Sequence, residues 1–405
     1  MIPAPRNPGE TTHATPQPGW HKPAVHRHFH RIAWLAVALT LGVVVFGAFV
    51  RLSDAGLSCP DWPTCYGRAT WPQASADAAG HAATAIRPFE THKAWREQVH
   101  RHLAAFLGLV VFSLALLAAR RRRWGISQVV AAAGLVALAI PLYMQGAHGA
   151  ATALAVLGEA MLLFAALRWS NVDLARAGAL TLAVIVFQAL LGMWTVTLLL
   201  KPIVVMGHLL GGLLTFSLLS WMAWRATDVP ILRADAGALR RWLWLALGVL
   251  GVQIALGGWV SANYAALSCG AGNWSAGNFP KCVGLWAPPA DFREGFVLWR
   301  GVGVDYEGGV LDGASRIAIQ LAHRMMAVVA FVVLLAMAMR LLRTPDLRFW
   351  GGLLGALTVA QVVLGILNVK LALPLAVAVM HNAGAALLLF VLVTLLARLR
   401  DVPRA

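Results

Sequence analysis

Ten apolar stretches, each of roughly 18 residues or more, restrict the fold of this chain more than any other feature, because a helix of that length can cross a lipid bilayer. Only 12% of the 405 residues are charged, about half the share usual for a soluble domain. A β-barrel would show short alternating segments instead. The sequence therefore predicts an all-α polytopic membrane protein. The expected spans are 32–51, 98–119, 126–145, 148–168, 178–200, 203–224, 243–261, 317–340, 350–370 and 375–397.

The formal net charge of +16 would suit a nucleic-acid-binding protein, but the basic residues are placed differently. They form short clusters beside the apolar stretches, as the positive-inside rule expects. With a cytoplasmic N-terminus, 20 of the 33 Lys and Arg residues fall on the cytoplasmic side. We therefore expect a multi-pass protein of the plasma (inner) membrane with both termini in the cytoplasm, and no nucleic acid partner.

The two halves of the chain repeat the same motifs in the same order, which indicates an internal duplication. Several independent matches at similar spacing are hard to attribute to biased composition. The matching segments are 50–59 with 260–269, 62–65 with 279–282, 100–101 with 323–324, 188–192 with 361–365, and His208 with His381.

The duplication predicts two pseudo-symmetric four-helix bundles related by an axis along the membrane normal. The stretch 126–168 has no counterpart in the second half. We expect it to be an inserted helical hairpin, which raises the count from eight core helices to about ten; one long span with an interfacial piece is the alternative. The expected division is a disordered cytoplasmic tail over 1–31, an N-terminal bundle over 32–225, a cytoplasmic linker over 226–242 and a C-terminal bundle over 243–398.

All four cysteines fall in the two long loops that this orientation places outside the cytoplasm, where disulfides can form and persist. One loop covers about 52–97 and the other about 262–316. We therefore predict two local disulfides, with redox-active thiols as the alternative. A four-thiolate zinc site would require the two loops to meet. The predicted pairs are Cys59–Cys65 and Cys269–Cys282.

Four histidines belong to the repeat, and all fall near the outer ends of their expected helices: His100, His208, His323 and His381. Ionisable residues inside a span are costly and usually face a bundle interior. Two histidines on facing helices suit bis-axial ligation of a haem iron. We therefore expect His100 to pair with His208, and His323 with His381. Hydrogen bonding between helices and a proton relay are alternatives, and zinc would lack its usual third protein ligand.

Charged neighbours of these histidines differ between the halves. Glu97 shares a helix face with His100, whereas Gln320 stands at the matching position. This asymmetry predicts that one half carries chemistry and the other carries electrons; a carboxylate favoured by the helix dipole is the alternative. Arg101 and Arg324 each follow a histidine, where a haem propionate could pair with the guanidinium. Their alternative role is snorkelling to the membrane interface.

Together these motifs resemble those of the haem A synthase family. The resemblance covers nearly the whole of 32–398 apart from the insert. Any one of the motifs alone would be weak, but the set is specific. The segments that carry it are Arg-Leu-Ser-Asp-Ala-Gly-Leu-Ser-Cys-Pro-Asp-Trp-Pro over 51–63, Lys-Ala-Trp-Arg-Glu-Gln-Val-His-Arg over 93–101, Gly-Met-Trp-Thr-Val-Thr over 192–197 and Gly-His-Leu-Leu-Gly-Gly over 207–212.

The resemblance implies an oxidoreductase that converts the C8 methyl group of haem O to a formyl group for cytochrome c oxidase biogenesis. It implies haem O as substrate in the N-terminal half and a permanent haem b cofactor in the C-terminal half. Implied partners are membrane lipid and haem O, and could include a haem O synthase, oxidase assembly factors and further copies of this chain. The implied residues are His100 and His208 on haem O, His323 and His381 on haem b, Glu97 as catalytic carboxylate, and Cys59 with Cys65 beside the substrate.

Two other functions account for part of the pattern. A di-haem b-type membrane electron-transfer cytochrome explains the four histidines but not Glu97 or the cysteine-bearing loops. A haem transporter or chaperone explains haem binding without chemistry. Haem content distinguishes the three, because a cytochrome holds two haem b, a synthase accumulates haem O or haem A in one site, and a transporter leaves the porphyrin unaltered.

Overall fold

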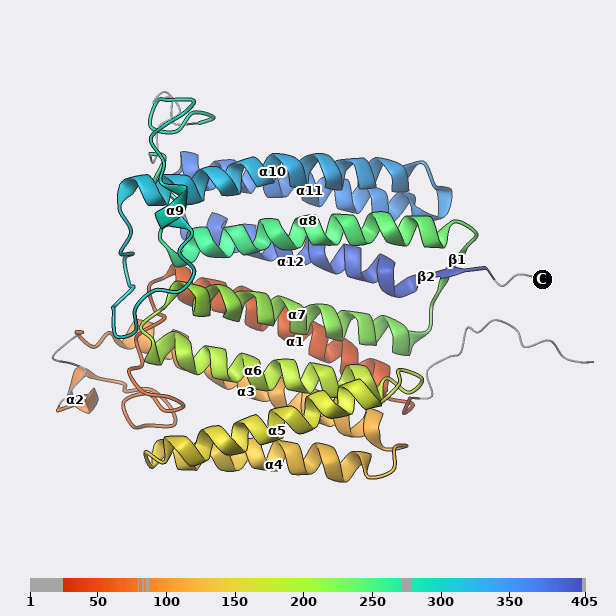
Figure 1. Ribbon diagram of the computed structural model, residues 1–405, viewed down its shortest axis with the longest axis horizontal. Coiled ribbons are helices and arrows are strands. Elements are labelled where there is room, and N and C mark those ends of the chain that lie inside the picture. Colours follow the sequence, from red (N-terminus) through yellow and green to blue (C-terminus); the bar gives the residue numbers. More distant parts are fainter. Residues whose placement is uncertain (1–24, 79, 82–83, 85–86, 271–278, 403–405) are drawn as a thin grey trace, which may run out of the picture.

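The computed structural model describes residues 25–78, 80–81, 84, 87–270 and 279–402. Within these residues, ten helices are long and apolar enough to cross a membrane, which confirms the predicted all-α polytopic fold. The helices run parallel or antiparallel to one another along the long direction of the molecule (Figure 1). Most of the tail expected over 1–31 lies outside the described residues, and α1 begins at Phe29.

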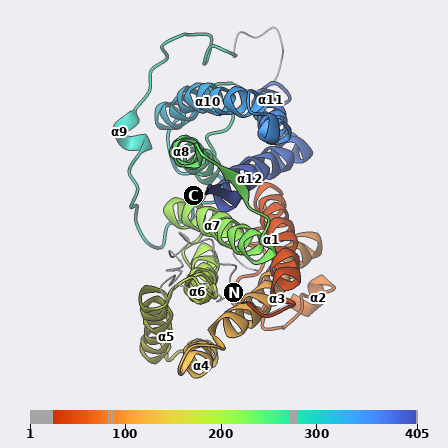
Figure 2. The same ribbon diagram turned by 90° about the vertical axis from the view of Figure 1, so that its right-hand side faces the viewer.

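Each half of the chain forms a ring of four helices. In the first half α1, α3, α6 and α7 contact one another in that cyclic order, and in the second α8, α10, α11 and α12 do the same. Figure 2, which looks along the helices, shows the two groups one above the other. The bounds are α1 Phe29–Leu52, α3 Thr91–Ala119, α6 Ala175–Thr197, α7 Pro202–Thr227, α8 Ala236–Ala262, α10 Gly313–Leu342, α11 Arg348–Lys370 after the short 3-10 turn η2 Pro345–Leu347, and α12 Leu375–Arg398.

The two rings meet through α1, α7, α8 and α12. Near the ends of the helices where the chain termini lie, Trp34 of α1 packs edge-on against Trp224 of α7 with ring centroids 4.8 Å apart. The indole N–H of Trp224 donates to Thr394 of α12 at 2.8 Å. An indole N–H inside the protein needs such a partner, so this bond ties α7 to α12, and the ring contact adds α1.

The inserted stretch forms two helices, α4 (Gly125–Met144) and α5 (His148–Arg168), which pack on each other and against α3 and α6. Each is long enough to cross the membrane, so the stretch is a hairpin rather than one long span. The helices approach closely at Gly158, where a β-carbon would lie 2.8 Å from the backbone oxygen of Ala132. Small residues allow this kind of packing where no hydrophobic effect drives helices together.

The connection between the halves is shorter than the linker expected over 226–242. The reason is that α7 continues to Thr227 and α8 already begins at Ala236. Arg240 therefore lies on α8, where it pairs with Asp401 at 2.7 Å and holds the C-terminal segment against the connection. Two short parallel strands lie beside this pair, β1 (Ile231–Arg233) and β2 (Leu399–Asp401).

Both long loops lie at the same end of the helices, which we call the cysteine side (residues 53–90 and 263–312); the opposite end is the terminal side. Both predicted disulfides are present, with S–S distances of 2.01 Å for Cys59–Cys65 and 2.00 Å for Cys269–Cys282. The loops also contain two short helices, α2 (Ser75–Ala78) and α9 (Phe292–Gly295).

The duplication extends to the backbone conformation of these loops. Each loop has a cis peptide bond before the proline that precedes its second cysteine, at Pro63 and at Pro280. Each second cysteine forms an isolated antiparallel bridge to the residue three positions on, Arg68 or Leu285. The repeated motifs in the sequence therefore correspond to a repeated local structure.

Candidate functional site

The four repeated histidines lie on α3, α7, α10 and α12, each in the half of its helix that is nearer the cysteine side. His100 and His208 lie on opposite helices of the first ring, α3 and α7, and His323 and His381 lie on opposite helices of the second, α10 and α12. The structure therefore brings together the two pairs expected from the sequence, one in each ring of helices.

The rings of these histidines are largely without protein partners. Within the described residues, the buried Nδ1 atoms of His100, His208 and His381 have no hydrogen-bond partner. Among the described residues, only His323 of the four has a hydrogen-bond partner at its ring, because Gln253 Nε2 lies 3.2 Å from its Nδ1. Hydrogen bonding between helices is the alternative role for buried histidines, and the rings of His100, His208 and His381 show no such bond among the described residues. A ring nitrogen without a protein partner is free to bind an iron, so the residues fit two-histidine ligation.

Each histidine ring also lies against a glycine of the neighbouring helix. A β-carbon at Gly47 would lie 2.8 Å from His100 Cε1, and at Gly257 it would lie 3.1 Å from His323 Cε1. Real β-carbons essentially never come as close as at Gly47, and the contact at Gly257 is tight enough that the ring would have to shift by a few tenths of an ångström. The four pairs are Gly47 with His100, Gly192 with His208, Gly257 with His323, and Gly365 with His381.

These glycines allow a test that is specific to each half. Gly257→Val is expected to displace His323 and remove haem from the second half only, whereas Gly47→Val should remove it from the first half only. Haem content of the purified protein, identified by extraction and chromatography, measures both effects. Gly251→Val on the same helix as Gly257 is the control, because nothing lies within 4 Å of a β-carbon there. Equal haem loss in the control would show that the effect is not local to the histidine.

Two glutamines hold the backbone beside one histidine of each pair. Gln188 Nε2 donates to the backbone oxygen of His208, and Gln361 Nε2 donates to that of His381 at 2.9 Å. Each glutamine lies on the helix next to its histidine and touches a glycine on the histidine's own helix. Both glutamines belong to the repeated segments of the sequence, but the sequence alone did not predict a role for them.

Glu97 is buried, with 5% of its surface exposed, and both of its oxygens are hydrogen-bonded. The backbone N–H of Cys59 donates to Oε2 at 2.8 Å, and Arg101 Nη2 donates to Oε1 at 2.5 Å. The helix dipole acts most strongly within the first turn of a helix. Because α3 begins at Thr91, Glu97 lies beyond that turn, so the dipole does not explain its position. The carboxylate is therefore fixed by specific partners from the disulfide loop and from its own helix.

The two arginines expected near haem propionates have different surroundings. Arg101 Nη1 donates to the backbone oxygens of Asp61 and Thr64, each at 2.7 Å, and its Nη2 pairs with Glu97. Arg324 Nη1 donates to the oxygen of Lys281 at 3.1 Å, but its buried Nε and Nη2 have no hydrogen-bond partner among the described residues. Arg101 is thus committed to the loop and the carboxylate, whereas Arg324 retains donors for a ligand.

The matching position in the second half has a different chemistry. Gln320 is also buried, and its Nε2 donates to the backbone oxygen of Ala266 at 3.2 Å. Glu97 accepts a hydrogen bond from the cysteine loop, whereas Gln320 donates one to it. The asymmetry between the halves therefore includes the direction of this hydrogen bond as well as the charge.

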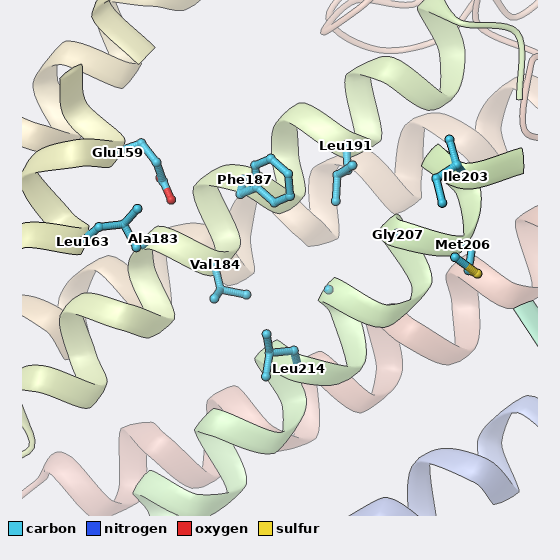
Figure 3. Close-up of a pocket in the computed structure, with 11 residues that line it drawn as sticks. Glu159, Leu163, Ala183, Val184, Phe187, Leu191, Ile203, Met206, Gly207 and Leu214 are labelled. Atoms are coloured by element: carbon cyan, nitrogen blue, oxygen red, sulfur yellow. The ribbon is translucent and has the colours of Figure 1, made fainter. Parts of the chain in front are cut away.

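A groove of about 420 Å³ lies between the inserted hairpin and the first ring. Figure 3 shows Glu159 pointing from α5 toward Val184 and Phe187 of α6, with Leu214 of α7 on the opposite wall. Its lining is apolar apart from Glu159 and contains none of the four repeated histidines. The groove therefore lies beside the helix that carries His208, and the ring of His208 is not part of its lining.

Comparison with known sequences identifies the family. The profile described as cytochrome oxidase assembly protein matches residues 30–160 and 151–393. The chain belongs to this family. A haem A synthase from Shewanella oneidensis is 36% identical over 372 residues, which cover 90% of this chain and 96% of that protein. A second haem A synthase, from Rhodospirillum centenum, is 32% identical over 180 residues, which cover 43% of each chain.

As a member of the cytochrome oxidase assembly protein family, the chain has its paired histidines, Glu97 and both disulfides within the matched residues. The glycines at the histidine rings were not anticipated from the sequence. Their signal was present, since Gly192 and Gly365 occupy matching places in the repeated segments. A buried lysine at the start of α7, Lys201, was also missed.

Proposed function

We propose that this chain is a haem A synthase, which oxidises the C8 methyl group of haem O to a formyl group. Membership of the family and the similarity to a haem A synthase over 90% of the chain support this proposal. The observation that carries it is the buried carboxylate of Glu97 beside His100, where the otherwise matching second half has Gln320. A duplicated cytochrome with two equivalent haems would have no reason for this difference.

In this proposal the first ring binds substrate and the second binds a resident cofactor. His100 and His208 would be the axial ligands of haem O, and His323 and His381 those of haem b. Haem b, when bound, supplies one-electron redox chemistry. The unpaired donors of Arg324 suit a haem b propionate, since guanidinium groups bind carboxylates well.

Glu97 is the residue that we assign to the chemistry. Conversion of a methyl to a formyl group adds oxygen to the reacting carbon and removes hydrogen and electrons from it, so protons are released as the electrons leave. A positioned carboxylate can accept such a proton or stabilise positive charge that develops near the carbon. Arg101 and the Cys59 amide fix the carboxylate, and the Cys59–Cys65 disulfide fixes the loop that carries this amide.

The proposed location is the plasma (inner) membrane, with the cysteine side outside the cytoplasm. Basic clusters at the terminal side support this orientation, since Arg120 to Arg123 follow α3 and Arg398 ends α12. The disulfides support it as well, because they persist outside the cytoplasm. A haem O synthase in the same membrane would supply the substrate.

Haem extraction tests the proposal directly. The chain is co-expressed with a haem O synthase, purified, and its haems are extracted with acid acetone and separated by chromatography. Haem A is expected in the wild type and not in His100→Ala/His208→Ala. If only haem b is found although the membrane contains haem O, the chain is an electron-transfer cytochrome and the proposed function is wrong.

A further inference from the structure

Lys201, the residue before Pro202 at the start of α7, is a buried amine that has no ion pair with any described residue. Only 1% of its surface is exposed, and its Nζ has no hydrogen-bond partner in the part of the chain that the structure describes. The ring centroid of Trp299 lies 3.5 Å from Nζ. A cation–π contact attracts the charge but leaves the three N–H donors of an ammonium group unmet. Burying such donors is costly unless an acceptor is supplied.

The position of Lys201 relates it to the first histidine pair. It precedes His208 by seven residues, which is close to two helical turns, so both lie on the same side of α7 about 10 Å apart along its axis. Lys201 is nearer the cysteine side. The positive end of the α7 dipole is at the same place and would add to its attraction for an anion.

The loop of the second half closes over this position. Trp299 belongs to that loop, and the backbone N–H of Tyr306 donates to the oxygen of Leu199 at 3.1 Å. Arg87 of the first loop pairs with Glu307 at 2.8 Å, which anchors the same segment. Because the loop excludes water, an anion bound to Lys201 would be held more strongly than at an open surface.

The second half has no equivalent of Lys201. Pro374 stands seven residues before His381, and the cation with unpaired donors there is Arg324. In the first half the reverse holds, because both terminal nitrogens of Arg101 are taken up by Glu97 and the disulfide loop. Each ring of helices therefore has a buried cation with unpaired donors. Among the described residues of the first ring, Arg51 and Arg96 also have an unpaired buried Nε, and Lys201 is the one whose terminal nitrogen is both buried and unpaired.

We propose that Lys201 binds a propionate carboxylate of the haem held by His100 and His208, and so positions the substrate. This inference rests on the proposed function. The ammonium group would donate to the carboxylate at the edge of the porphyrin that faces the cysteine side. A haem anchored in this way has a fixed rotation about the axis between the two histidines, which determines the peripheral group that lies near Glu97.

A chemical double-mutant cycle tests this contact. The full-length protein, with haem b in its second half, is titrated with ferric protohaem and with its dimethyl ester, and binding is followed by Soret absorbance. Lys201→Met is expected to weaken the binding of protohaem by about 10- to 100-fold, as for a lost hydrogen bond to a charged group. It should weaken the ester much less, because the ester has no carboxylate. Lys201→Arg should restore most of the affinity for protohaem.

The control variant is Lys281→Met, which removes another loop lysine that lies over a tryptophan, at 5.7 Å from the ring of Trp286. It should leave both affinities unchanged. Equal weakening of protohaem and ester by Lys201→Met, or loss of haem b from the second half, would show a structural role and overturn the inference. Unchanged binding of protohaem by Lys201→Met would also overturn the inference, and Lys201 would then be assigned to another anion, such as a lipid phosphate. If the wild type binds no haem that depends on His208, the proposed function itself fails.

Discussion

Glu97→Gln is expected to lower haem A formation by at least about 100-fold and to let haem O accumulate in the protein, as for the loss of a positioned acid–base group. Glutamine has nearly the same shape, and its carbonyl oxygen can still accept the Cys59 N–H that now lies 2.8 Å from Oε2. It can neither take up a proton nor pair with the charge of Arg101. Extraction of haems after co-expression with a haem O synthase measures both expected changes.

The matched control is Gln320→Ala, which alters the corresponding buried position of the second half. Its haem A yield should stay within a few-fold of the wild type. Because Glu97→Gln leaves a buried arginine without its ion partner, haem b content serves as the measure of folding. Haem A at the wild-type level in Glu97→Gln, with haem b retained, would remove Glu97 from the reaction.

The reason that one carboxylate can distinguish two similar halves lies in the disulfide loop. In the first half, the loop presents the N–H of Cys59 and three backbone oxygens to the α3 pair Glu97 and Arg101. In the second half, Arg324 receives a single oxygen from the loop, and Gln320 needs no counter-charge. A charged pair inside a membrane requires many hydrogen bonds, and the first loop supplies them.

The sequence predicted the fold well because bilayer-spanning helices satisfy their own backbone and depend on little else. All ten expected spans correspond to helices, and the ends differ by about two turns at most. The largest differences are at Thr91 and Ala236, where α3 and α8 extend beyond the apolar core of the span. The sequence predicts a loop up to residue 97 and a linker up to residue 242, but the charged residues at both places are helical and make ion pairs such as that of Arg240 with Asp401.

The paired histidines and the disulfides could be predicted because the duplication repeats them in the same order in both halves. The roles of the cations could not. A guanidinium next to a ligand histidine suggests a propionate contact, and only the fold reveals that Arg101 turns toward the loop and Glu97. Lys201 was missed because a lysine beside a span normally reaches the membrane surface. Its burial depends on the loop around Trp299, which is distant in the sequence.

His381→Ala is expected to remove haem b from the second half and to stop haem A formation while haem O still binds in the first half. The loss should exceed the 10- to 100-fold that is typical when only an outer partner of a metal ligand is removed. The reason is that oxidation of a methyl group releases electrons, and in the proposed division of labour they leave through haem b. The haem composition of the purified variant, determined by extraction and chromatography, checks this expectation.

Two further variants make the interpretation of His381→Ala specific. His208→Ala should show the opposite pattern, with haem b retained and both haem O and haem A absent, because His208 belongs to the first pair. His102→Ala should behave as the wild type, since this histidine is exposed on α3 two residues from His100. If His381→Ala loses haem b and still forms haem A, the second half is not the electron path. Electrons would then pass directly from the substrate site to an acceptor, and the duplication would serve stability alone.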